Sequence, residues 1–356
     1  MASGHFYTRL VQLAALEQGS QLAFAMKDSG AGQFYLRQAQ ALTRILIQDH
    51  WITTDQIFIP QHVGIQNLIH SKESNETTLR PPKSGLDSAI LCGILHVWNW
   101  QKVDSQLRKK KKENSPWSLP DLTLTPNSGL AYFAGDQDPV VQSVHEILKK
   151  NQNLFPINSL KGSKSHPIGM AIGRYMEDVY DGIGISSGNP WILLTLYMAE
   201  YFYLLVILVF SHPLPVSPSL QNLLLYLNQL YGPHPLPSLS SSFPIQSKSH
   251  IQVCRFLKVM GDIFVNRVEF HFHENPLGTF LPEQIHKETG KWRGALNLTW
   301  SSAAFISTCT GQRLATSLLN HVPKDETQND EKREGKEKME SWEEEKLVEV
   351  DFGGEL

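Results

Sequence analysis

The chain has 356 residues, of which 41% are hydrophobic and 10% aromatic, which is enough for one large domain or two ordinary ones and excludes a wholly disordered protein. The net charge of −3 is unevenly divided: residues 324–356 hold six Lys/Arg and 13 Asp/Glu and contribute −7, which leaves residues 1–323 at +4. Nothing in this nearly neutral body suggests a nucleic-acid-binding surface, and the three cysteines have no metal-ligand spacing and allow at most one disulfide bond.

Apolar periodicity predicts an all-α protein with almost no strand signal. The first helical pattern is amphipathic, with Phe6, Leu10, Leu13, Leu16 and Phe24 near one face. The predicted helices are residues 5–27, 34–47, 89–97, 140–150, 191–210, 255–271 and 300–320, with a short Leu-rich helix at 220–230.

Polar segments separate these helices. Residues 83–88 offer N-cap side chains immediately before the apolar run 89–97. Residues 101–133 are irregular and contain a run of basic side chains at 108–112, which we interpret as a solvated loop insertion. The tail at 324–356 is rich in charge and lacks periodicity, and so we expect it to be disordered.

Residues 191–210 are apolar over the length that a membrane span requires. Glu200 lies in the middle of this run, and a helix buried on all sides in a protein core would have the same composition. We therefore expect a core helix and no membrane span. A membrane-anchored protein that uses this segment is the weaker alternative.

The stretch 173–180 combines Arg, two carboxylates and two Tyr, and it continues to Gly-Asn-Pro-Trp at 188–191. Arg and carboxylates hydrogen-bond vicinal hydroxyls, and aromatic faces stack on sugar C–H surfaces, so this mixture suits an uncharged polyhydroxylated ligand. The stretch resembles the signature of fungal glucoamylases, glycoside hydrolase family 15, in the yeast-like branch. Residues 282–284 and 297–302 resemble two further motifs of that family, in the same order.

The resemblance implies an (α/α)6 barrel of twelve helices, inner and outer, with the active site built from loops at one end. We expect residues 1–323 to be the C-terminal portion of such a catalytic domain, an incomplete barrel with about seven of the twelve helices. Residues 4–12 resemble the family helix that follows a Trp-Glu-Glu segment, whose first Glu is the general acid. We therefore expect this acid to be missing, because Trp342-Glu343-Glu344 lies in the tail and is read as a chance match.

Inverting glycosidases use one carboxylic acid and one carboxylate that activates water. The resemblance implies that Glu283 is the general base and that Gln284 binds the neighbouring sugar. It also implies that Arg174 holds hydroxyls of the terminal glucose. Asp178 maps onto the same substrate-binding stretch, although at i+4 it could equally be only the ion-pair partner of Arg174.

Three aromatic residues, Tyr180, Trp191 and Trp300, map onto family side chains that line the pocket near the base. The alternative is that they are core residues, since aromatics at helix starts often are. The cluster His271, His273 and Glu274 lacks a zinc-protease pattern, and we expect no metal and no organic cofactor.

The resemblance therefore implies a glucan 1,4-α-glucosidase that acts on starch, glycogen or maltooligosaccharides and releases β-D-glucose with inversion. We expect the chain by itself to be inactive. The alternative is a degenerate, non-catalytic carbohydrate-binding protein. Family resemblance implies a secreted or vacuolar location, which the sequence itself does not indicate.

Overall fold

The computed structural model describes residues 5–52, 57–58, 86–98, 128–163, 166–211, 216–232, 236, 247–273 and 280–320. The chain divides into two units, residues 1–319 and 320–356, and the elements below belong to the first. The basic run at 108–112, Glu274 and the predicted tail lie outside the described residues. The elements are α1 (Phe6–Ala25), α2 (Ser29–His50), β1 (Trp51–Ile52), β2 (Ile57–Phe58), α4 (Ala89–Val97), η1 (Gly129–Phe133), α6 (Asp138–Leu154), η2 (Pro156–Ser159), α7 (Ile192–Ser211), α8 (Pro218–Tyr231), α9 (Lys248–His273), β3 (Gln284–Ile285), β4 (Trp292–Arg293) and α10 (Thr299–Asn320).

The all-α prediction is confirmed, and each predicted helical range overlaps one of the eight α-helices of the described residues. Several helices extend beyond their predicted ends: α2 begins at Ser29 and α9 at Lys248, because polar first turns carry no apolar periodicity. Within the segment expected to be irregular, residues 129–133 form the 3-10 helix η1.

The apolar helix α7 is the core element, and every residue from Ile192 to Phe210 is buried. It packs most extensively against α9 and also contacts α4. Glu200 is accommodated because its carboxylate accepts a hydrogen bond from the Ser307 hydroxyl of α10 at 2.6 Å. Among the described helices only α7 is long and apolar enough to cross a membrane, and its whole apolar window is buried inside the protein, as expected of a core helix.

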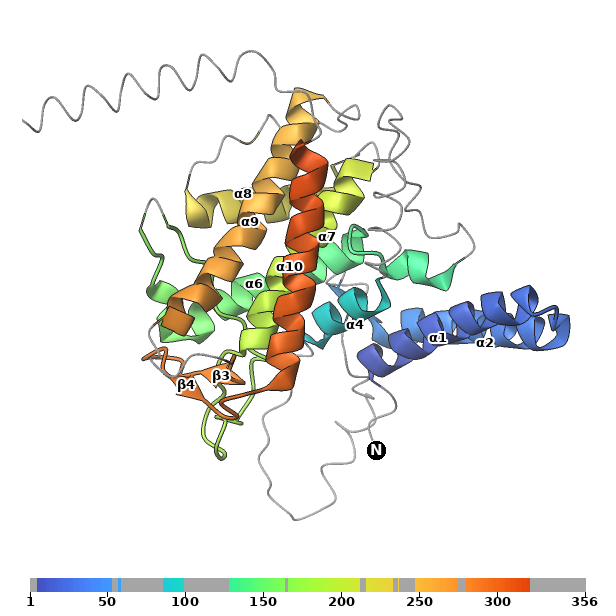
Figure 1. The fold of residues 1–356 in the computed structure, drawn as a ribbon, viewed down its shortest axis with the longest axis horizontal. Coiled ribbons are helices and arrows are strands. Elements are labelled where there is room, and N and C mark those ends of the chain that lie inside the picture. The colour runs from blue at the N-terminus through green and yellow to red at the C-terminus, as the bar shows by residue number, and fades with distance from the viewer. Residues whose placement is uncertain are drawn as a thin grey trace, which may run out of the picture. The chain divides into compact units, whose positions relative to one another are not determined.

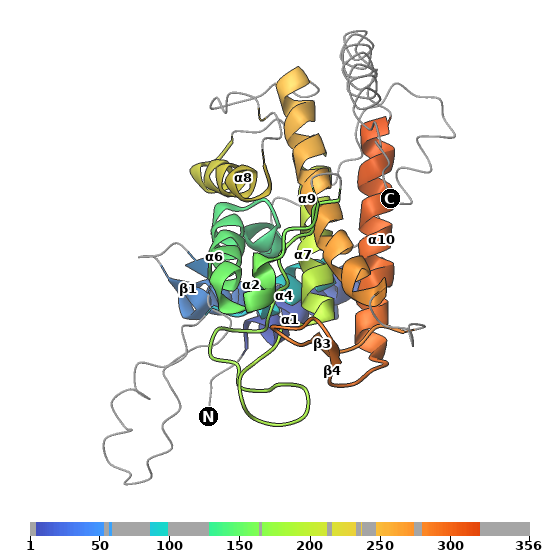
Figure 2. The ribbon, with the colours of Figure 1, turned by 90° about the vertical axis from the view of Figure 1, so that its left-hand side faces the viewer.

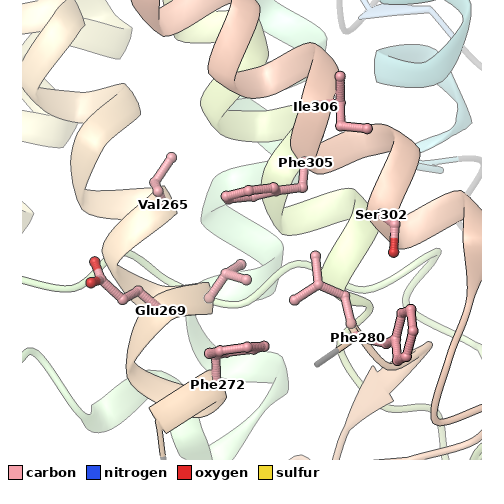
Figure 3. Close-up of a pocket in the computed structure, with 9 residues that line it drawn as sticks. Val265, Glu269, Phe272, Phe280, Ser302, Phe305 and Ile306 are labelled. Atoms are coloured by element: carbon pink, nitrogen blue, oxygen red, sulfur yellow. The ribbon is translucent and has the colours of Figure 1, made fainter. Parts of the chain in front are cut away.

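The helices α9 and α10 run beside α7 in both views (Figures 1 and 2). Hydrogen bonds tie α10 to its neighbours: the Thr308 hydroxyl donates to the Leu196 carbonyl at 3.2 Å, and the Gln312 amide donates to Asp262 at 2.9 Å. Between α9 and α10 an apolar groove of about 750 Å³ remains, into which Phe272 and Phe305 project (Figure 3).

Helices α1 and α2 form an antiparallel pair at the start of the chain (Figure 1). Phe6, Leu10 and Leu13 are fully buried, as the amphipathic pattern predicts. The expectation for Phe24 is wrong, because this residue is 44% exposed and its ring lies over Gly32 of α2. The last turns of α1 extend beyond the core, so periodicity continues there without a surface to bury it.

The hairpin of β3 and β4 is joined to the N-terminal end of α7. The backbone N–H of Ile192 donates to the Glu283 carbonyl at 3.1 Å, and that of Ile285 donates to the Pro190 carbonyl at 3.1 Å. The Ser301 hydroxyl, in the first turn of α10, donates to the Pro282 carbonyl at 2.8 Å. The starts of α7 and α10 and this hairpin therefore meet at one end of the helices.

Candidate active site

The loop at 173–180 is anchored from two helices. Asn151 of α6 accepts the Gly173 N–H at 2.9 Å, and the Ser88 hydroxyl donates to the Gly173 carbonyl at 2.7 Å. The expected N-cap of α4 is therefore divided between two residues: Ser88 holds the loop, while the Asp87 carboxylate accepts the Ala89 N–H at 2.8 Å. The loop start is thus fixed by α4 and α6 together.

Arg174 and Asp178 form a two-bond ion pair. Nε donates to Oδ2 at 2.7 Å and Nη2 donates to Oδ1 at 2.6 Å. Burial opposes the charge of Arg174, but the bonds to Asp178 outweigh it and raise the pKa of the guanidinium. Asp178 is therefore the ion-pair partner of Arg174, as the alternative interpretation expected. The pair does not lie on a helix: it forms in a turn in which the Asp178 N–H donates to the Tyr175 carbonyl.

Three aromatic rings surround the Arg174 guanidinium. Its central carbon lies 5.0 Å from the ring centre of Trp191 and 5.4 Å from those of Tyr175 and Tyr180. Cation–π contacts of this kind hold a guanidinium in place. Trp191 is only 8% exposed, and one of its contacts is with the Arg174 guanidinium.

Glu283 is largely buried beside this cluster, with 8% of the residue exposed. Its Oε2 accepts the Ala295 N–H at 3.0 Å and the Tyr180 hydroxyl at 3.4 Å. Partial burial and the negative charge of Glu283 raise the pKa of Tyr180, which keeps the phenol protonated as a donor. The other carboxylate oxygen of Glu283, Oε1, has no hydrogen-bond partner in the described part of the chain.

Gln284 is fully buried and pairs with Trp191 across an isolated β-bridge. Its Oε1 accepts the Asn189 amide at 3.2 Å, whereas its Nε2 has no partner among the described residues. Asn189 also donates to the Asp181 carbonyl at 2.8 Å and accepts the Lys287 N–H at 3.1 Å. Asn189 therefore joins the loop after Tyr180 to the β3–β4 hairpin.

The loop 181–186 forms one rim of the site. The Asp181 carboxylate accepts N–H groups of Gly184 and Ile183 and the Ser186 hydroxyl, and these bonds lower its pKa. Arg293 of β4 donates to the Asp181 carbonyl at 3.0 Å. Sequence reasoning missed Asp181, Asn189 and Arg293 as organising residues, although the first two lie within or beside the stretch that carried the resemblance.

Trp300 lies in the first turn of α10 and is 45% exposed. Its indole N–H donates to the Tyr197 hydroxyl at 2.8 Å. Its neighbour Ser301 is bonded to the carbonyl of Pro282, the residue before Glu283. The structure thus brings together one cluster of six predicted residues: Arg174, Asp178, Tyr180, Trp191, Glu283 and Gln284. Trp300 is not in contact with this cluster among the described interactions, although its neighbour Ser301 is bonded to the residue before Glu283.

The described residues contain no group of three His, Cys, Asp or Glu side chains placed to hold a metal ion. His271 is buried and carries its own structural role, since its carbonyl accepts the Trp292 indole N–H at 3.0 Å. The three cysteines are free thiols.

The likeness of this helical fold to solved structures places it in the class of (α/α)6-barrel domains. The structure of the Saccharomycopsis fibuligera glucoamylase is similar at 26% sequence identity and a TM-score of 0.64, covering 90% of this chain and 57% of that chain. A family 15 glucoamylase from Hypocrea jecorina shares the fold at 19% identity and a TM-score of 0.62.

The particular family follows from the sequence profile of glycosyl hydrolases family 15, which matches residues 2–310: the chain belongs to this family. A glucoamylase of Blastobotrys adeninivorans is 25% identical over 329 residues, which are 90% of this chain and 44% of that protein. The intracellular sporulation-specific glucoamylase of Saccharomyces cerevisiae is 27% identical over 310 residues, 85% of this chain and 48% of that protein. The chain spans about half the length of the curated relatives it matches.

Proposed function

We propose that this chain supplies the general base and the sugar-holding side of a glucoamylase-type active site. The reaction is the inverting hydrolysis of terminal 1,4-linked α-D-glucosyl residues at the non-reducing ends of starch- or glycogen-type glucans, with release of β-D-glucose. The observation that carries the proposal is the environment of the Glu283 carboxylate. Its Oε2 is bonded to Tyr180, whose ring packs on Arg174, while its Oε1 has no hydrogen-bond partner among the described residues.

Glu283 is the proposed base. The Ala295 N–H and the Tyr180 hydroxyl both point at Oε2, so they orient the carboxylate without occupying Oε1. Oε1 then accepts the proton of the attacking water. General base catalysis of this kind contributes roughly 10²–10⁴-fold to the rate.

Arg174 is the proposed hydroxyl-binding residue. Asp178 engages Nε and Nη2, whereas Nη1 has no partner among the described residues and can donate to a sugar hydroxyl. The surrounding rings hold the guanidinium plane, which reduces the conformational entropy lost on binding. Asp178 positions Arg174 through its two hydrogen bonds, and the Trp191 ring packs against the guanidinium.

An inverting mechanism also requires a carboxylic acid, ~6.5–9.5 Å from the base, that protonates the leaving oxygen. Two carboxylates of the loop that contacts Glu283 do not fit this role, because Asp178 is bound to Arg174 and Asp181 is bound to its own loop. We therefore assign the acid to neither of them. The second candidate function needs only the hydroxyl-binding Arg174 cluster: a protein that binds glucan ends without hydrolysing them.

The test uses the chain fused behind the N-terminal half of a yeast glucoamylase, and glucose release from maltose is measured. Glu283→Gln keeps the shape of the side chain but cannot accept a proton, and we expect turnover to fall by at least about 100-fold while maltotriose binding persists. Glu288→Gln, an exposed residue of the same hairpin, is the control and should leave turnover unchanged.

Arg174→Ala should weaken sugar binding as well as turnover, because charge-assisted hydrogen bonds contribute roughly 1.5–3 kcal/mol each. If Glu283→Gln keeps more than a few per cent of turnover, the base is another residue. If the fusion binds maltotriose but releases no glucose, the binding-only function is the correct one.

A further inference from the structure

Tyr197 is a buried residue of α7 that contacts a candidate sugar-facing residue. The Trp300 indole N–H donates to its hydroxyl at 2.8 Å. Tyr197 is 3% exposed, while Trp300 is 45% exposed, so the ring is open to solvent although its one polar atom is held from inside. A half-exposed tryptophan at a helix start would otherwise be free to change rotamer.

The Tyr197 hydroxyl is itself fixed by two further helices. Its oxygen lies 2.8 Å from His96 Nε2, and His96 Nδ1 lies 3.0 Å from the Tyr7 hydroxyl. The His96 ring meets the Tyr197 and Tyr7 rings edge-on, with centres 5.4 and 5.6 Å apart. One line of hydrogen bonds therefore connects α10, α7, α4 and α1.

Donor chemistry gives this line a direction. An indole N–H can only donate, so the Tyr197 oxygen accepts from Trp300 and its own hydrogen is left for His96 Nε2. A neutral imidazole that accepts at Nε2 carries its hydrogen on Nδ1, which then donates to Tyr7. Burial lowers the pKa of His96 and so favours this neutral form. The titratable groups of the packed helices that act on Tyr197 are Cys92, Glu200 and Tyr7, and Glu200 is bonded to Ser307.

The position of Trp300 relates this line to catalysis. The hydroxyl of the adjacent Ser301 donates to the Pro282 carbonyl, so the start of α10 contacts the loop that carries Glu283. We propose that Tyr197, held by His96 and Tyr7, is a positioning residue that orients the Trp300 indole as a stacking surface for the α-glucosyl ring next to Glu283. This rests on the proposed function, since it assumes a glucan in the site.

The first experiment asks whether Tyr197 controls the Trp300 ring in the full chain. The indole N–H signals are recorded by ¹⁵N NMR, and that of Trp300 is assigned with Trp300→Phe. Tyr197→Phe should shift the Trp300 signal and speed its exchange with solvent by about tenfold or more, because the buried acceptor is lost. Tyr203→Phe is the control. Tyr203 lies on α7, as Tyr197 does, but its hydroxyl is bonded to Asp262 and not to Trp300.

An unchanged Trp300 signal in Tyr197→Phe, or an equal change in Tyr203→Phe, would overturn the proposal. If Tyr197→Phe does not fold, His96→Leu replaces it. This variant keeps the acceptor but removes the group that orients it, so a smaller shift of the same signal is expected, and no shift again refutes the proposal.

The second experiment adds maltotriose. The Trp300 signal of the unmodified chain should move on titration, and Tyr197→Phe should weaken the affinity roughly three- to tenfold, while Tyr203→Phe should not. A Trp300 signal that ignores maltotriose refutes the stacking role. The proposed function is judged separately, by turnover of Glu283→Gln in the fusion, so either idea can fail while the other stands.

Discussion

Gly294 packs directly against the Glu283 carboxylate, so Gly294→Ala should displace that carboxylate. Gly294 has a φ of +72°, and an added Cβ would collide with Glu283 Oε2. A left-handed conformation costs an L-residue roughly 1–2 kcal/mol. Displacing the carboxylate also breaks its bond from the Ala295 N–H, a charged hydrogen bond that contributes roughly 1.5–3 kcal/mol.

We therefore expect Gly294→Ala to lower the free energy of unfolding by about 2.5–5 kcal/mol, measured by urea denaturation of the full chain. The matched control is Gly294→Ala in a Glu283→Ala background, where the same backbone carries the same Cβ but the Oε2 collision is absent. The loss there should show the backbone penalty alone. A loss in Gly294→Ala no larger than this control loss would refute the reasoning, because the carboxylate would then have moved without cost.

Two other predictions follow from buried and exposed residues. Burial and the nearby Arg267 lower the pKa of His271 from 6.5 to about 4, so its neutral form is favoured in the folded protein. The resulting stability is complete above pH 6.5 and is lost as the pH falls towards 4, by up to about 3 kcal/mol, and urea unfolding at several pH values should give a flatter profile for His271→Leu. The groove between α9 and α10 exposes Phe280, Phe305 and Ile306, so the chain should self-associate as its concentration rises in size-exclusion chromatography. Ile306→Lys should reduce this association and Leu225→Lys, on α8, should not; a monodisperse unmodified monomer would contradict the prediction.

The helical class and the approximate helix positions could be predicted because local periodicity records which face of each helix is buried. The uninterrupted apolar run of α7 is the clearest case, since only a helix surrounded by others can bury all its faces. The same logic failed at Phe24, because periodicity does not reveal where the neighbouring surface ends. The loop residues that form the site were found from their likeness to a family signature, with no contribution from periodicity.

What the sequence determined by itself was therefore which segments are helical and which polar residues stand out between them. The tertiary structure alone decided how those residues meet. Glu283 is oriented by Tyr180, 103 positions away, and by a backbone N–H beyond the β3–β4 turn. Trp300 is held through Tyr197 by groups on α4 and α1. These hydrogen bonds join segments remote in the chain, and their geometry exists only once the helices have packed.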